Sequence, residues 1–268
     1  MKNISVKIPF TKGRLIWAPQ DGNGSARIFA GQEFMTHLSA DHFRKGKLYD
    51  KFDLGSGLVT NVGVAAMAND PFWASPSAAS CATLALANYH ASGTGATTAA
   101  ATDIALQTSA GPAPAAGAQT NVSAANSAQY KTVATLAYTT GLAITEWGLH
   151  SAAVLSVATG SPFTTTSVTG GAVTSTPLTA SSTSVRGQQQ YIVVSGTVWG
   201  LITSNTTGAL VIPAWYKTAD GTLGSTPSGT ATYTLQPVMW DHKVFSAINV
   251  VNGDSIQFTY TLTINSGG

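Results

Sequence analysis

The chain has 268 residues and a mass of 27.4 kDa, which suits one large β domain or two modest ones. Only 9% of the residues are charged, but 44% are hydrophobic and 9% are aromatic, which excludes a disordered chain. The net charge of +2 is too small to predict nucleic-acid binding, no run of 18 apolar residues indicates a transmembrane helix, and a single cysteine, Cys81, excludes an intrachain disulfide.

The first part of the sequence is basic. Nine of the 13 Lys and Arg residues lie in positions 1–51, and none lies in 52–130. We therefore predict that residues 1–53 form an extended basic N-terminal arm that binds an acidic partner, the alternative being a solvated surface segment. The first ten residues alternate apolar and polar side chains and lack the continuous apolar core of a signal peptide, so synthesis in the cytosol is expected. The cations assigned to partner binding are Lys2, Lys7, Lys12, Arg14, Arg27, Arg44, Lys45 and Lys47.

A single helix is predicted next. Residues 57–69 carry an apolar face at helical spacing, Ser56 can cap the helix, and Pro71 ends it. Residues 74–128 are rich in Ala, Ser, Thr and Gly, and they are predicted to form short strands and loops that pack on larger neighbours.

The clearest strand is 256–264. Its apolar and polar residues alternate over nine positions, a period that no helix satisfies. Asn252-Gly253 predicts a tight hairpin turn to a partner strand at 244–251. A second pair of strands is predicted at 130–138 and 142–149, around the turn 139–141.

Residues 157–236 differ in composition from the rest of the chain. This stretch is rich in Ser, Thr and Gly, and its strand signals are short; they lie at 191–194, 197–202, 210–216 and 230–235. We predict an inserted β domain within a core domain of residues 54–156 and 237–268, the alternative being one large sandwich with a long excursion. Trp199, Trp215 and Tyr216 are candidates for an outward binding surface, although a domain this small favours aromatic residues in its core.

The predicted fold class is mainly β: an antiparallel β-sandwich or jelly-roll-like domain with one short helix, the N-terminal arm and the inserted second β domain. This prediction depends on the period of two in the strands and on the turn residues between them.

No pattern of catalytic or metal-binding residues is strong. The spacing of His37, Asp41 and His42 is only weak evidence for a metal site. Asp241 and His242 are adjacent in a strand, so their side chains point to opposite faces and form no dyad. Nothing in the sequence places any two of the candidate acids together; these are Asp103, Glu146, Asp220 and Asp241. We therefore expect no enzymatic activity, no metal and no cofactor.

Three phrases carry a resemblance to a known class of proteins. They are LAITEWGLHSA at 142–152, KVFSAINVVNGDSIQFTYTL at 243–262 and NYHASGTG at 88–95. Together they resemble virion structural proteins of tailed bacteriophages, in which the first two phrases stand close together across a short turn. Here about 90 residues separate them, which also favours an insertion. The structural motif residues of these phrases are Glu146, Trp147, Gly148, Asn252, Gly253 and Asp254.

The resemblance implies a capsid decoration, or cement, protein on the capsid surface of a virion, made in the host bacterial cytoplasm. It would stabilise the shell by binding between subunits of the major capsid protein as a homotrimer, with other virion proteins as further partners. It implies no membrane partner, and nucleic acid is not an expected partner. One alternative is a tail, baseplate or fibre component whose insert binds a host glycan. Another is a carbohydrate-binding domain that acts outside the virion.

Overall fold

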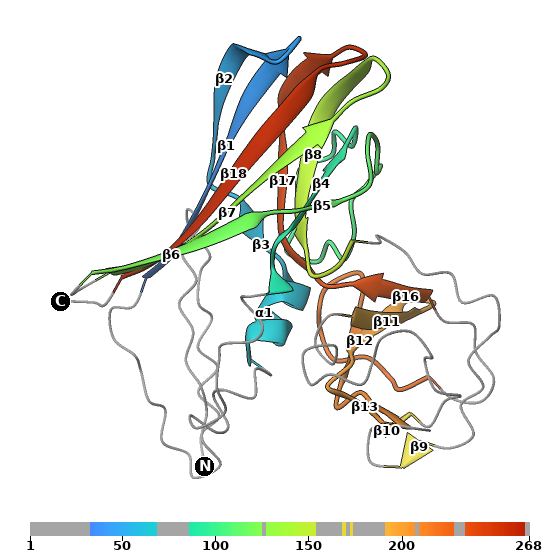
Figure 1. The fold of residues 1–268 in the computed structure, drawn as a ribbon. Helices are drawn as coiled ribbons and strands as arrows, with labels where there is room; N and C mark the ends of the chain where they lie inside the picture. Colours follow the sequence, from blue (N-terminus) through green and yellow to red (C-terminus); the bar gives the residue numbers. More distant parts are fainter. Residues whose placement is uncertain are drawn as a thin grey trace.

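Two antiparallel sheets face each other as a sandwich, and a group of shorter strands joins one end (Figure 1). The computed structural model describes residues 33–68, 86–124, 127–153, 168–169, 172–173, 191–206, 209–227 and 234–265. The expected mainly β, antiparallel, sandwich-like fold with one short helix is confirmed, whereas the jelly-roll detail is not. In the described ranges, no helix has the length and apolar character needed to cross a membrane.

The first sheet has the strand order β2-β1-β18-β7-β6. Its central strand is β18, which contains the alternating segment of the sequence, and its inward residues 256, 258, 260 and 262 are at most 5% exposed. The predicted strand is thus confirmed, because only an extended chain places these side chains on one face. The strands are β1 (Glu33–Arg44), β2 (Lys47–Gly55), β6 (Ala118–Ala124), β7 (Ser127–Ala137) and β18 (Ser255–Asn265).

The second sheet has the order β3-β17-β8-β4-β5, and all its pairs are antiparallel. Its long central strand β8 contains most of the phrase 142–152, and β17 contains the first part of the phrase 243–262, whose second part lies in β18. The strands are β3 (Leu58–Val59), β4 (Tyr89–Gly93), β5 (Ala115–Ala116), β8 (Leu142–His150) and β17 (Met239–Val250).

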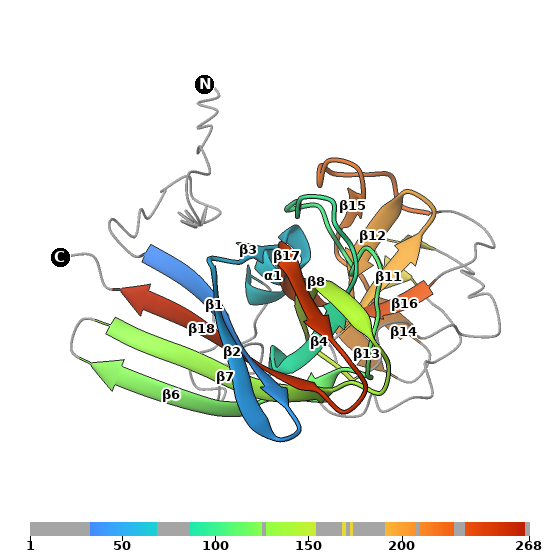
Figure 2. The ribbon, with the colours of Figure 1, turned by 90° about the horizontal axis from the view of Figure 1, so that it is seen from above.

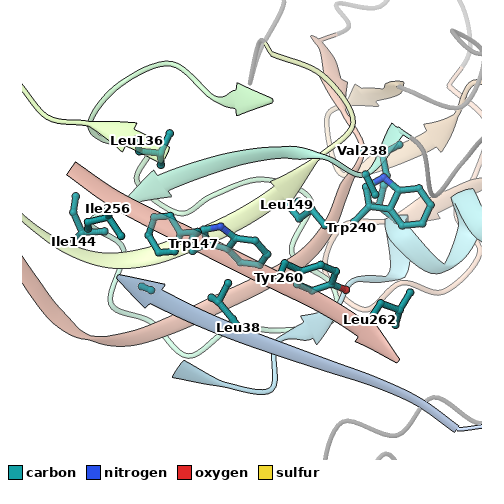
Figure 3. Close-up of a cluster of buried hydrophobic side chains, with 14 of the residues drawn as sticks. Leu38, Leu136, Ile144, Trp147, Leu149, Val238, Trp240, Ile256, Tyr260 and Leu262 are labelled. Carbon is teal, nitrogen blue, oxygen red and sulfur yellow. The ribbon is translucent and has the colours of Figure 1, made fainter. Parts of the chain in front are cut away.

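Aromatic and branched side chains from both sheets fill the space between them. The Trp147 ring of β8 stacks on the Tyr260 ring of β18, with centroids 5.6 Å apart. Figure 3 shows these two rings side by side, with Leu38 from β1 and Leu149 from β8 around them. The burial of such side chains is the main term that stabilises the sandwich, at about 1.5–3 kcal/mol for each large residue.

The predicted strand pairs are corrected by the structure. Segments 130–138 and 142–149 are strands, but β7 lies in the first sheet and β8 in the second. Likewise, β17 pairs with β8, whereas β18 pairs with β1 and β7. The turns 139–141 and 251–254 therefore carry the chain from one sheet to the other. A period of two places residues on faces, but it does not say which strand is the neighbour.

The predicted arm is corrected in its second part. Residues 33–53 are not an extended arm: β1 pairs along its whole length with β18, and β2 pairs with β1. The inward positions of β1 are Thr36, Leu38, Ala40 and His42, all at most 4% exposed. Small and polar residues at these positions conceal the alternation. The predicted cations Lys2, Lys7, Lys12, Arg14 and Arg27 lie outside the described residues.

The helix is shorter than predicted. It is α1 (Asn61–Ala68), and β3 occupies the first residues of the predicted helix. The cap is Thr60 and not Ser56, because the Thr60 hydroxyl oxygen accepts a hydrogen bond from the Gly63 amide at 3.0 Å. The predicted stop at residues 69–71 lies outside the described residues.

The shorter strands follow β8 and precede β17. One sheet has the order β15-β12-β11-β16 and another has β13-β14-β10-β9. The predicted strand 210–216 is two strands in the structure, since Pro213 lies between β14 and β15. Bounds are β9 (Val168–Thr169), β10 (Ala172–Val173), β11 (Tyr191–Ser195), β12 (Val198–Leu201), β13 (Ser204–Thr206), β14 (Ala209–Val211), β15 (Trp215–Lys217) and β16 (Thr234–Pro237).

The chain leaves the sandwich after β8 and returns to it just before β17, and these two points lie next to each other. The Ser151 amide donates to the Val238 carbonyl at 3.0 Å, and the Val238 amide donates to the Ser151 hydroxyl at 2.9 Å. The strands also share the sandwich core, because Ile192, Trp199 and Leu201 pack in one cluster with residues of β8 and β17. Figure 2 shows β8 and β17 between the first sheet and β11–β12.

Candidate functional site

A buried histidine held between two carboxylates is the most concentrated polar chemistry in the described residues. His242 on β17 lies with Nδ1 2.7 Å from Asp103 Oδ2 and Nε2 2.9 Å from Glu146 Oε1. The His242 and Glu146 side chains are 0% exposed, and Asp103 is 23% exposed. We call these three residues the carboxylate–histidine cluster.

The glycines of the 88–95 phrase let the loop after β4 approach Glu146. The carboxylate accepts hydrogen bonds from the amides of Gly95 and Thr108, each at 3.1 Å, and from the amide of Gln107. A Cβ atom at Gly95 would lie 2.6 Å from Glu146 Oε2, and one at Gly93 would collide with the same oxygen. Glu146 thus fixes the loop 94–108 to the outer face of the second sheet.

The charges of the cluster follow from these contacts. Burial alone would raise the pKa of Glu146, but hydrogen bonds from His242 and from the Gln107 and Thr108 amides outweigh it and lower that pKa. Burial alone would lower the pKa of His242, but its hydrogen bonds to Glu146 and Asp103 raise it. The raised pKa favours the imidazolium form, which donates from both ring nitrogens and so ties β17 to β8 and to the loop that carries Asp103.

The expectation for Asp241 and His242 agrees with their geometry, because the two side chains leave β17 on opposite faces. Asp241 points between the sheets, where Tyr260 and Thr36 are its polar neighbours. Its carboxylate is completely buried, and neither oxygen makes a hydrogen bond of normal geometry among the described residues. Burial raises the pKa of Asp241 to about 7.

A second buried junction lies at the turn from β17 to β18. Asp254 Oδ2 is 2.9 Å from His42 Nε2 and 3.1 Å from Arg44 Nη2, and it accepts the Val251 amide at 3.1 Å. Burial would raise the pKa of Asp254, but the bonds from Arg44 and His42 lower it to about 2. Gly253 has φ +87°, the positive value expected of this glycine, although the turn joins strands of different sheets and not the predicted hairpin. The ion pair of Asp254 with Arg44 was not predicted.

The other motif residues are structural as well. Trp147 is completely buried, and its Nε1 donates to His90 Nδ1 at 3.2 Å. At Gly148 a Cβ atom would lie 2.8 Å from His150 Nε2 and 2.9 Å from Leu106 Cδ2, so a close approach of side chains requires this glycine.

The aromatic surface proposed on the shorter strands is corrected. Trp199 and Trp215 are each 2% exposed, so neither faces outward. Tyr216 is half-buried, and its ring lies 4.8 Å from that of Trp199. The small sheets need these large side chains as their core, which leaves no exposed aromatic platform at these three positions.

The suggested metal residues have separate partners. His37 Nε2 is 2.9 Å from Asp53 on the surface, His42 contacts Asp254, and Asp41 lies 3.8 Å from Lys51. Among the described residues, no group of three or more His, Cys, Asp or Glu side chains could hold a metal ion. Cys81 lies outside these residues.

Sequence reasoning missed the carboxylate–histidine cluster because its members come from three separate segments. Asp103 lies in a loop, Glu146 in β8 and His242 in β17. The isolated Glu in an apolar strand was the available signal, since a buried carboxylate needs partners.

Comparison with known proteins adds no relative. No family model, no curated protein sequence and no solved structure matches this chain significantly.

Proposed function

We propose that the chain is a structural protein of a tailed-bacteriophage virion, and specifically a capsid decoration protein that binds between capsid subunits. It would bind the assembled shell and not the free subunits, so it would stabilise the shell by mass action. The proposal includes self-association, as a homotrimer, and no catalytic role.

One observation carries the proposal. The phrases 142–152 and 243–262 are far apart in sequence, but β8 pairs directly with β17, with Trp147 of the first phrase opposite Lys243 of the second. If residues 152–237 were removed, a short turn could join the two strands, which is the arrangement the resemblance implies. In this proposal the Ser151–Val238 hydrogen bonds would lie at the point of insertion.

The polar chemistry of the phrases gives further support. Glu146 and Asp254 are both used in internal bonds that hold strands and loops together. Two buried carboxylates that tie strands and loops together in this way suit a rigid attachment role. The alternative, an insert that binds a glycan, has less support because Trp199 and Trp215 are buried and cannot contact a sugar.

The test is the copy number of the chain in purified particles, measured by quantitative mass spectrometry against the major capsid protein. A ratio near one, or a simple fraction of one, is expected of a protein that covers the shell. A few copies per particle would place the chain in the tail or neck, and its absence from particles would overturn the proposal.

A further inference from the structure

The end of the sandwich that lies away from the shorter strands has an unusual surface. Figure 1 shows the β1–β2 turn beside the connections from β17 to β18 and from β7 to β8 at this end. Three of the six exposed large hydrophobic residues among the described ones lie here: Leu48 (48% exposed), Tyr49 (61%) and Val251 (49%). We call Arg44, Lys45, Lys47, Leu48, Tyr49 and Val251 the tip.

The tip is held in one shape. Lys45 and Gly46 have φ +51° and +73°, the positive values of a tight two-residue turn between Arg44 and Lys47. Arg44 bonds to Asp254, which is fixed by the Val251 amide. The Tyr138 amide donates to the Asp254 carbonyl at 2.8 Å, so the two connections are tied to each other. A rigid surface loses little conformational entropy on binding.

A β-bulge directs the exposed side chains to both faces of the hairpin. The register shifts between His42 and Phe43, so Tyr49 has no partner residue on β1. Its ring lies under the Arg44 guanidinium, 4.2 Å from the carbon to the ring centre. Leu48 pairs with Phe43 and lies on the opposite face. A bulge in an edge strand opposes pairing with a further strand, so recognition would use side chains.

The charge of the tip indicates the chemistry of its partner. Arg44, Lys45 and Lys47 provide three positive charges, Asp254 is buried and bonded to Arg44, and one exposed acid, Asp50, follows Tyr49 on β2, so the tip keeps an excess of positive charge. Lys45 and Lys47 are exposed. A partner surface must therefore supply acidic groups. A simple polyanion offers no apolar surface for Leu48 and Val251, whereas a groove in a protein can bury these side chains and also pair with the charges.

We propose that the tip docks into an acidic groove on the surface of another protein. The inference rests on the proposed function for the identity of that protein, which would be the capsid shell. The hairpin enters the groove with Lys45 and Lys47 facing carboxylates and with Leu48 and Tyr49 against the two walls.

The experiment uses DNA-free shells stripped of this chain and the full-length purified protein. Binding of the wild type is measured by co-sedimentation over a range of salt concentrations. The test variant is Lys45→Glu/Lys47→Glu, and its matched control, with the same change in charge elsewhere, is Lys131→Glu/Lys217→Glu. Leu48→Ser is paired with Leu223→Ser, which changes another exposed leucine (71% exposed). Circular dichroism confirms that each variant is folded.

We expect the charge-reversed tip to bind the shell at least about tenfold more weakly, because like charges then meet in the interface. Leu48→Ser should weaken binding by about threefold to tenfold, and both controls should bind as the wild type does. If the tip variants bind as well as the controls do, the docking proposal is overturned while the decoration function stands.

Two further outcomes separate the proposals. If the wild type fails to bind stripped shells at all, both the decoration function and this partner are overturned. If the wild type instead binds naked duplex DNA, and the Lys45→Glu/Lys47→Glu variant loses that binding, the tip recognises nucleic acid and the protein-groove proposal is overturned.

Discussion

Glu146 and Asp241 are both buried in the second sheet, on neighbouring strands, but they differ in their hydrogen-bond partners and in the direction of their pKa shifts. Glu146 on β8 accepts four hydrogen bonds, from His242 and from three backbone amides. Asp241 on β17 makes no hydrogen bond of normal geometry among the described residues, and the nearby polar groups of Tyr260, Thr36 and Leu58 do not offset its burial. The pKa of Glu146 is therefore lowered, whereas that of Asp241 is raised to about 7. Burial raises the pKa of both carboxylates, and only Glu146 has partners strong enough to outweigh it.

The two carboxylates also have different structural roles. The ionised Glu146 fixes a loop of fifteen residues, 94–108, through directional bonds. Asp241 fills a space between the sheets beside Gly57, where a Cβ atom would collide with its carboxylate. Glu146 holds the loop on the sheet, whereas Asp241 fits the space between the sheets at little cost in stability only while its carboxyl group is protonated.

The largest effect is expected for Glu146→Gln. The substitution keeps the shape but removes the charge that faces His242, and breaking a buried pair in this way costs about 3–5 kcal/mol of unfolding free energy. Denaturant unfolding at pH 7 measures it. Because the folded pKa of Glu146 is lowered, its contribution is present above the unfolded pKa and is lost as the pH falls through the folded value. The loss in the variant should therefore shrink in acid.

Asp241→Asn should show the opposite dependence on pH. The folded pKa of Asp241, about 7, lies above its ordinary value of 3.8, so the folded state holds a proton that the unfolded state has released. Wild-type stability therefore falls, relative to the variant, as the pH rises from about 4 to about 7, by about 1.4 kcal/mol for each unit. Unfolding curves at pH 4, 5.5 and 7 measure the difference. A difference that stays constant with pH would show that Asp241 is ionised in the folded protein.

The glycines next to the two carboxylates give a smaller effect. Gly57→Ala and Gly95→Ala each place a methyl group against a carboxylate oxygen, and overpacking of this kind costs about 1–3 kcal/mol. In an Asp241→Ala background, the cost of Gly57→Ala should fall, because the colliding atoms are gone. A double-mutant cycle measures this coupling, and strictly additive free energies would contradict the close contact.

The smallest effect is expected at the turn beside Asp254. Gly253→Ala introduces a side chain at φ +87°, where nothing else lies within 4 Å, so only the backbone conformation is affected. The expected loss is about 1–2 kcal/mol, measured by thermal unfolding. Gly141→Ala is the control, since it has an ordinary φ and its nearest contact is 3.6 Å away. An equal loss at both positions would contradict the account of the turn.

The sequence predicts the fold best where alternation is strong. In β18 the inward residues are large and apolar, and the strand follows from them, while the positive φ of Gly253 follows from the turn residues before it. In β1 the inward residues include Thr36, Ala40 and His42, so the same period is hidden and the segment is mistaken for an arm. Strand neighbours are a different problem, because they depend on contacts between distant segments.

The candidate site is only partly visible in the sequence. Glu146 stands out as an acid in an apolar strand, but its partners come from the loop 94–108 and from His242, 96 residues later. Trp199 and Trp215 show the reverse case: their residue type suits a binding surface, but the small strands bury them. Residue type indicates what a side chain can do, and packing decides whether it meets a partner.

Glu146 holds the loop 94–108 as part of a rigid framework, and amide hydrogen exchange tests this role most directly. The amides of Gly95, Gln107 and Thr108 should exchange slowly in the wild type and much faster in Glu146→Gln, while amides in β18 change little. If these three amides already exchange rapidly in the wild type, Glu146 does not hold the loop. Asp103 and His242 would then have to be considered as a site with another role.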